Sequence, residues 1–430
     1  MRNETIFWNN VYLDLVRRTG GGPGPIARAG ALMHAAMFNA INSTLPAVSR
    51  KTAFDGFANV APAGASKEAA LAHAASKVLK HVYGPEFNGL IDRKLKESTL
   101  YFTGGVADGQ AIGEVAAMKI INERGDSGSN SKYMQAIVPG YSAPTGPGQW
   151  RPTGSGNALG PNWSELVPFA MATSSAFRPP FPGGFSGANA VSDLLKSEIY
   201  ASQWDDVRRV GRYDSTERTA DQTEIAFFWA NDVDGTSKPP GQLYGITQGV
   251  AQARMLNMED TARLFALVAI ATVDASILAW DAKYKLKVNL WRPETAIQRA
   301  FEDDNERTSA DLAWKPLSAH YDGFRFSPNF PAYVSGHATF GAAHARVMEK
   351  FFGTDNISFT VYSEDPHMPR DGNGVKKGRH FTSFSQAAKE NGRSRIYLGV
   401  HYQWDADAAY DKAREMVDSI IQNKFMDWPL

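Results

Sequence analysis

The sequence predicts a mainly α-helical protein. Apolar residues recur at helical spacing through much of the 430-residue chain, and no run of alternating β-branched residues stands out. The length exceeds that of a usual single core, which favours two units. We place the boundary inside the charged stretch 205–218, which gives an N-terminal unit over residues 1–215 and a C-terminal unit over residues 216–430.

The N-terminal unit begins with a series of amphipathic helices. Residues 25–40 start at a proline and carry apolar side chains at helical spacing, and residues 67–82 and 109–124 repeat the pattern. Because their apolar faces need partners, these helices are expected to form a bundle. Residues 139–184 are rich in Pro, Gly, Ser and Trp and have no sustained period, so we expect a long functional loop there.

Helical periodicity returns after this loop, over residues 188–202, 219–231, 243–256 and 260–287. The longest apolar run, residues 264–280, carries Asp274 in its middle, which favours a buried core helix over a membrane span. We therefore expect no transmembrane segment. The first residues lack the apolar stretch of a signal peptide, so the sequence leaves the location of a soluble protein open; a removed signal would imply secretion or the periplasm.

Composition excludes several classes of function. The chain has 45 Lys and Arg against 45 Asp and Glu, so it offers no basic field for nucleic acid or an anionic membrane. It has no cysteine, which excludes disulfides, thiolate metal sites and cysteine nucleophiles. Positive charge that matters for function must therefore be local.

The first local cluster of positive charge combines Lys285 with Arg292, which precedes a proline. On one continuous helix, their spacing of seven residues would place both side chains on the same face. Asp274 and Asp281 would share that face. Since a buried guanidinium usually needs a carboxylate, we expect one of these acids to pair with Arg292 or Arg395.

The second cluster is the tripeptide Ser335, Gly336 and His337, which directly precedes a helical pattern. At a helix N-terminus, serine can cap, glycine allows a ligand to approach the backbone, and free N–H groups favour an anion. His344 follows His337 by seven residues, which places it on the same helix face as a candidate supporting residue.

The third cluster contains Arg395, His401 and Asp405. Asp405 lies one helical turn after His401, close enough to orient the imidazole. Taken singly, each cluster is explained by capping or surface ion pairs. Together they supply three permanent cations, serine and backbone donors and two histidines, a set that suits a tetrahedral or trigonal-bipyramidal oxyanion.

The order and spacing of these clusters resemble a known signature. Lys285-x6-Arg292-Pro293, Ser335-Gly336-His337 and Ser394-Arg395-x5-His401 are similar to the vanadium-dependent haloperoxidases and to the related acid phosphatases of the type 2 phosphatidic acid phosphatase superfamily. Further likeness to the bacterial haloperoxidases lies in residues 27–42, 220–230 and 330–343. The chain departs from the superfamily at Val334, where proline is frequent.

This resemblance implies two helical bundles, with a vanadate site in the C-terminal one that phosphate also fits, and a homodimer. His401 would be the axial ligand of vanadium, and His337 would be the acid and base that handles peroxide protons. Lys285 would also polarise the peroxide. The groups that would hold the vanadate oxygens are the side chains of Lys285, Arg292, Ser335 and Arg395 and the N–H of Gly336.

The activity implied by the resemblance is halide oxidation by hydrogen peroxide, followed by halogenation of a small organic acceptor. Phe330 precedes the motif serine by five residues, where chloride-competent members of the family tend to have phenylalanine, so we expect bromide and chloride to be oxidised. The same residues leave two alternatives open. One is an acid phosphatase with a phosphohistidine at His401, and the other is a protein that binds an oxyanion without turnover.

Overall fold

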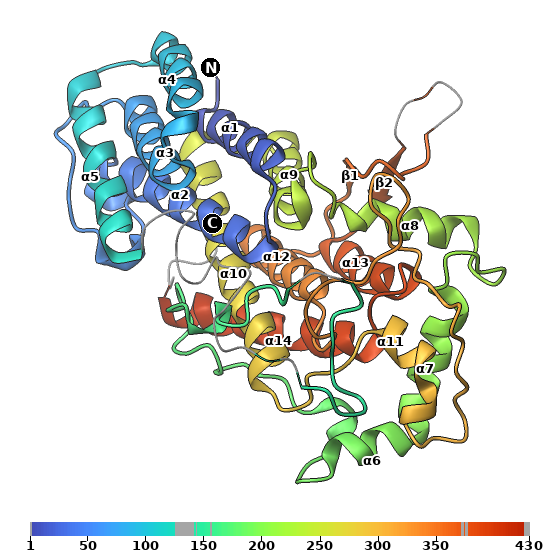
Figure 1. Ribbon diagram of the computed structural model, residues 1–430. Coiled ribbons are helices and arrows are strands. Elements are labelled where there is room, and N and C mark those ends of the chain that lie inside the picture. Colours follow the sequence, from blue (N-terminus) through green and yellow to red (C-terminus); the bar gives the residue numbers. More distant parts are fainter. Residues whose placement is uncertain are drawn as a thin grey trace.

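The computed structural model describes residues 2–124, 142, 144–154, 157–370, 374 and 377–424. These residues are mostly helical, which confirms the predicted fold class (Figure 1). Short 3₁₀ turns connect some of the helices: η1 (Ala47–Ser49), η2 (Phe54–Gly56), η3 (Pro85–Phe87), η4 (Thr99–Tyr101), η6 (Trp163–Glu165), η7 (Pro182–Gly184) and η8 (Ala300–Glu302).

The first five helices gather at one end of the molecule (Figure 1). Three of them, α2, α3 and α5, pack against one another and bury their alanine-rich faces, as the periodicity predicted. The bounds of the group are α1 (Glu4–Thr19), α2 (Pro23–Ser43), α3 (Lys67–Tyr83), α4 (Asn88–Ser98) and α5 (Val106–Arg124).

The rest of the described chain adds nine helices and one small sheet. The expected helix over residues 188–202 is divided in two, because Ser197 leaves the helix and caps the next one through its side chain. The helices are α6 (Ala190–Lys196), α7 (Glu198–Val210), α8 (Ala220–Ala230), α9 (Lys238–Ala253), α10 (Met258–Lys285), α11 (Pro293–Gln298), α12 (Gly336–Phe352), α13 (Phe384–Tyr397) and α14 (Gln403–Lys424). Strands β1 (Phe359–Tyr362) and β2 (Gly378–Phe381) form an antiparallel pair.

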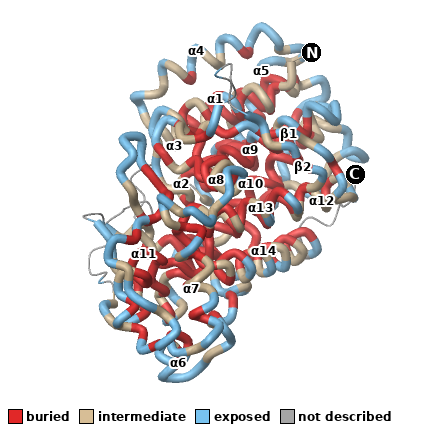
Figure 2. Tube along the Cα trace, turned by 90° about the vertical axis from the view of Figure 1, so that its right-hand side faces the viewer, coloured by how far each residue is buried: buried red, intermediate tan, exposed pale blue. Residues whose placement is uncertain are grey.

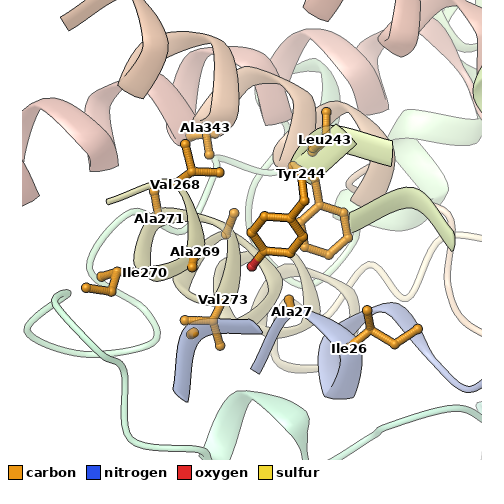
Figure 3. Close-up of a cluster of buried hydrophobic side chains, with 14 of the residues drawn as sticks. Ile26, Ala27, Leu243, Tyr244, Val268, Ala269, Ile270, Ala271, Val273 and Ala343 are labelled. Atoms are coloured by element: carbon orange, nitrogen blue, oxygen red, sulfur yellow. The ribbon is translucent and has the colours of Figure 1, made fainter. Parts of the chain in front are cut away.

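Helix α10 is the centre of the core. It packs against α2 on one side and against α12 on the other, and its most apolar stretch of 18 residues lies wholly inside the protein. This confirms a buried core helix in the apolar run, and Figure 2 shows the buried residues concentrated around it. Figure 3 shows its small side chains beside Tyr244 of α9, Ala27 of α2 and Ala343 of α12. Neither the division at residue 215 nor the homodimer has support from this packing, and both stay predictions.

Asp274 fastens a loop onto α10. Its carboxylate accepts backbone N–H bonds from Phe169, Ala170 and Met171 at 2.6, 2.7 and 2.7 Å. Its side chain is completely buried, and this burial raises its pKa to about 6 although the three N–H groups favour the charged form. The expectation that Asp274 pairs with Arg292 or Arg395 is therefore wrong: backbone donors, rather than a guanidinium, satisfy this acid.

Asp281 is also directed at the loop. It accepts two bonds from Arg178, at 2.5 and 2.9 Å, so its predicted pairing with Arg292 or Arg395 is wrong as well. The two acids of α10 thus hold two separate points of the Pro- and Gly-rich segment against the core. Residues 139–141, 143, 155 and 156 of the predicted loop 139–184 lie outside the described residues.

We expect Asp274→Ala to lower the free energy of unfolding by about 2–4 kcal/mol, because it leaves three buried N–H donors without an acceptor. Urea unfolding at neutral pH measures this, with Asp234→Ala as the control at an acid whose side chain is 85% exposed. A loss no greater than that of the control would contradict the proposed fastening.

Candidate active site

The second and third sequence clusters meet at one cavity of about 860 Å³, and Arg292 of the first cluster contacts His401, which lines the cavity. Gly336 and His337 line it from the start of α12, Arg395 from the end of α13, and His401 from the turn before α14. The elements that carry these residues lie far apart in the sequence, and the packing of α12 against α13 and α14 brings them together. The geometry therefore joins the motifs in the way that the oxyanion hypothesis requires.

The N-terminus of α12 supplies backbone donors. Ser335 is the N-cap, and its Oγ accepts the N–H of Ala338 at 3.3 Å. The first turn of any α-helix has N–H groups without a partner inside the helix, and the helix dipole adds positive potential there. The backbone N–H of Ser335 donates to the carbonyl of Asp405 at 3.0 Å, which fixes the start of α12 against the start of α14.

The imidazole of His401 is held in one tautomer. Arg292 Nη1 lies 3.0 Å from His401 Nε2, and since a guanidinium only donates, Nε2 accepts. The proton then sits on Nδ1, which donates to Asp405 Oδ2 at 2.8 Å. This confirms the expected orientation of His401 by Asp405, and burial among cations lowers the pKa of His401. His401 Nε2 therefore carries a lone pair beside the cavity.

Two buried guanidinium groups have donors to spare. Arg395 donates to Asp232 Oδ2 at 2.8 Å, while Arg292 donates to the carbonyl groups of Phe330 and Val400. Arg292 Nη2, Arg395 Nε and Arg395 Nη1 have no hydrogen-bond partner within the described part of the chain. Buried cationic donors without acceptors are unfavourable, so this arrangement calls for an anion with several oxygens.

Asp232, which follows α8, is a residue that the sequence motifs do not indicate. Besides Arg395, its carboxylate faces His337, with Oδ1 3.7 Å from Nε2. Burial raises the pKa of Asp232, but His337 and Arg395 outweigh this and bring it below its ordinary value. Asp232 thus positions one cation and one imidazole of the site, and nothing in its spacing from the motifs signals this role.

His337 is placed to exchange a proton. Its Nε2 lies 3.1 Å from the carbonyl oxygen of Ala230, so Nε2 carries the hydrogen and Nδ1 the lone pair in the neutral ring. Burial, and next the charge of Arg395, lower the pKa of His337 to about 4. A negative charge bound nearby would raise this pKa again, because it stabilises the imidazolium.

Lys285 does not lie with the other cations. Its Nζ is 3.2 Å from Glu165 Oε1, and its side chain is 41% exposed. The expected shared helix face fails because α10 ends at Lys285, while Arg292 is the N-cap of α11. The spacing of seven residues therefore spans an irregular connection, and the helical geometry assumed for it does not apply.

Lys283 is the lysine that the structure brings to the site. Its side chain is completely buried, and its Nζ donates to the carbonyl groups of Pro331, Ala332 and Val334 at 2.8, 3.1 and 2.5 Å. Burial, and next the charge of Arg292, lower the pKa of Lys283. The lysine that the structure buries beside Arg292 is therefore Lys283, and the motif lysine Lys285 lies at the exposed end of α10.

Phe330 lies beside two of these cations. Its ring centroid is 4.9 Å from Lys283 Nζ and 4.8 Å from the Arg292 guanidinium carbon, and the ring also contacts Trp280. Phe330 and Trp280 both line the cavity. His344, by contrast, binds Thr247 on α9 through Nε2 at 3.0 Å, inside the core between α9 and α12.

The donor set fits an oxyanion better than a metal cation. Within the described residues, no group of three or more His, Asp or Glu side chains could hold a metal ion. The cavity instead presents guanidinium donors, helix N-terminal amides and one imidazole lone pair. An oxyanion whose central atom can accept a nitrogen ligand satisfies all three.

Comparison with known proteins agrees with this chemistry. Residues 263–425 match the family model described as the VCPO second helical-bundle domain. The vanadium chloroperoxidase of Curvularia inaequalis is 29% identical over an alignment that covers 95% of this chain and 80% of the relative. Both matches are similarities to vanadium chloroperoxidases, and the family model covers the C-terminal part of the chain.

Solved structures show that the haloperoxidase fold extends over nearly the whole chain. The crystal structure of a bacterial vanadium-dependent iodoperoxidase superposes with a TM-score of 0.75 at 23% identity, covering 97% of this chain and 95% of the other. A bacterial vanadium-dependent chloroperoxidase in its holo form superposes with a TM-score of 0.69 at 16% identity, covering 93% and 92%. At these identities the likeness establishes the fold.

The lowered pKa of His337 makes a prediction about acid stability. With a pKa of about 4 for His337 in the folded protein and about 6.5 in the unfolded chain, the unfolded chain binds more protons between these values. The contribution of His337 to the free energy of unfolding therefore falls by about 2 kcal/mol as the pH drops from 6.5 to 4.5.

Urea unfolding at both pH values should show this loss reduced in His337→Gln and retained in His380→Gln, a control at an exposed histidine of β2. An equal loss in the two variants would contradict the assignment.

Proposed function

We propose that this protein binds vanadate and uses hydrogen peroxide to oxidise halide to a hypohalous acid. The observation that carries the proposal is the set of three unpartnered guanidinium donors beside the lone pair of His401 Nε2. The similarity to a vanadium chloroperoxidase supports the same activity. Bound vanadate would supply a Lewis acid that activates the peroxide toward halide.

The groups that would hold vanadate are mostly those that the sequence indicated. His401 would ligate it through Nε2, which Asp405 keeps unprotonated by holding the proton on Nδ1 and which accepts from Arg292 in this structure. In place of Lys285 we assign Lys283, whose buried charge lies in the same cluster as Arg292. The donors to the oxyanion would be the side chains of Arg292, Ser335 and Arg395 and the N–H of Gly336.

His337 would move the protons. Its Nδ1 carries a lone pair in the neutral ring, so it can take a proton from hydrogen peroxide and return it to the oxygen that leaves as water. The carbonyl of Ala230 and the carboxylate of Asp232 orient the ring. The overall reaction balances as peroxide, halide and one proton giving hypohalous acid and water.

The identity of the halide is inferred from Phe330 and its surroundings. Phe330 supports oxidation of chloride as well as bromide, because its ring occupies the position where chloride-competent members of the family tend to have phenylalanine. The ring also places an apolar surface beside two cations, an environment that strips water from a halide. We therefore propose both ions as substrates.

The activity is tested with purified protein, orthovanadate, hydrogen peroxide and bromide, following bromination of a phenol-type dye. We expect turnover that requires vanadate and that phosphate inhibits by competition. Rapid hydrolysis of para-nitrophenyl phosphate, inhibited by vanadate and without any bromination, would instead establish the phosphatase alternative.

A pair of variants tests which lysine serves the site. We expect Lys283→Met to weaken vanadate binding more than tenfold, since it removes a buried charge beside the oxyanion, and Lys285→Met to change it less than twofold. Equilibrium dialysis measures both Kd and the number of sites, so partial unfolding, which lowers the number of sites, is distinguished from weaker binding. A larger effect of Lys285→Met would return the role to the lysine that the motif selects.

A further inference from the structure

The cavity extends beyond the cations along a second wall, formed by residues 320–326. His320, Tyr321, Phe324 and Phe326 all line it. We call these four residues the ring wall. They belong to the same cavity as His337, Arg395 and His401, so a molecule held by the ring wall shares one space with the reacting groups.

Three members of the ring wall are nearly parallel. The His320 ring lies 4.0 Å from that of Phe326 with 15° between their planes, and 6.4 Å from that of Phe324 with 18° between them. Phe324 is 68% exposed and Tyr321 is 63% exposed, although both are large. Exposed aromatic faces gathered at a cavity are typical of a binding surface, because covering them with a ligand is favourable.

The opposite side of the cavity is close to the ring wall. A Cβ atom at Gly235, in the loop after α8, would lie 3.7 Å from the Tyr321 hydroxyl. The neighbouring residues Asp232, Asp234 and Lys238 also line the cavity. The gap between the loop after α8 and the ring wall is therefore narrow at Tyr321, which favours a flat ligand over a bulky one.

The ring wall itself presents little charge. Two charged residues of the same segment, Asp322 and Arg325, also line the cavity. Arg325 donates to the carbonyl of Leu317, and its guanidinium carbon is 5.5 Å from the Tyr213 ring centroid. Because the charges of Asp322 and Arg325 are opposite and the ring wall itself is aromatic, the segment as a whole does not favour an ionised ligand of either sign. A volume of about 860 Å³ is ample for a ligand of two fused rings.

We propose that the ring wall binds planar, electron-rich aromatic acceptors, so that halogenation takes place inside the cavity. The proposal rests on the haloperoxidase function for its chemistry. A ring carbon of the acceptor attacks the halogen of hypohalous acid, and the halogen–oxygen bond breaks. The hydroxide released takes the proton lost from the ring carbon and becomes water. The acceptor stacks on the open face of Phe324, continuing the parallel arrangement with His320.

Binding of 2-naphthol by isothermal titration calorimetry, without vanadate, halide or peroxide, tests the site independently of activity. We expect Phe324→Ala and Tyr321→Ala each to weaken binding about two- to tenfold, and Phe324→Tyr to retain it. Decahydro-2-naphthol, which has the same carbon skeleton without aromatic rings, should bind the parent protein more weakly than 2-naphthol does.

The matched control is Phe301→Ala, at a phenylalanine that is 68% exposed on η8 and outside the cavity lining. Equal binding of 2-naphthol by the parent, Phe324→Ala and Tyr321→Ala would overturn the proposal. Equal binding of 2-naphthol and decahydro-2-naphthol by the parent would overturn it as well. Because Phe324 is exposed, its replacement leaves the core intact.

A second measurement separates this proposal from the proposed function. With vanadate, bromide and peroxide, 2-naphthol and a small non-aromatic β-diketone compete as acceptors, and we expect Phe324→Ala to shift the product ratio toward the brominated diketone. An unchanged product ratio with normal turnover would overturn only the proposal that the ring wall binds the acceptor. If neither acceptor is brominated, the haloperoxidase function is overturned. The calorimetry would still decide whether the ring wall binds 2-naphthol.

Discussion

Uncompensated positive charge in the protein interior is the constraint on which this structure depends. Lys283, Arg292 and Arg395 are buried together, with the carboxylates of Asp232 and Asp405 as the acids nearest to them. Burial lowers the pKa of Arg292 to about 9, far below its ordinary value, and raises that of Asp405. The site therefore keeps a net positive charge in a poorly solvated place, which makes it selective for an anion and repels metal cations.

The backbone holds this charge in place. Lys283 donates to three carbonyl groups just before α12, those of Pro331, Ala332 and Val334, so the lysine also shapes the chain that leads into the Ser335 cap. Asp405 orients His401 through its carboxylate and accepts the N–H of Ser335 through its carbonyl. The same groups that bind a ligand thus position one another, and this explains why several of them come from loops directly before helices.

Periodicity and motif spacing predicted much of this arrangement. The helices of the N-terminal bundle and the buried course of α10 followed from apolar spacing, and the Ser335 cap and the pair of His401 with Asp405 followed from local geometry. The expectation that Lys285 and Arg292 share one helix face was wrong, because a spacing rule cannot tell where a helix ends. Asp232 was missed because its partners are joined to it only by tertiary packing. The acids of α10 were assigned to the wrong partners because the loop that they hold carries no periodic signal.

The bond between Ser335 and Asp405 has a consequence for how the protein behaves in a cell. It joins the starts of two helices that lie about seventy residues apart in the chain, so the oxyanion site exists only once both have docked. A ligand that binds only the folded chain stabilises it by mass action, by about 2.7 kcal/mol at one hundred times its Kd. If vanadate is that ligand, scarcity of vanadium would lower the lifetime of the protein as well as its activity, and its abundance would follow the supply of the element.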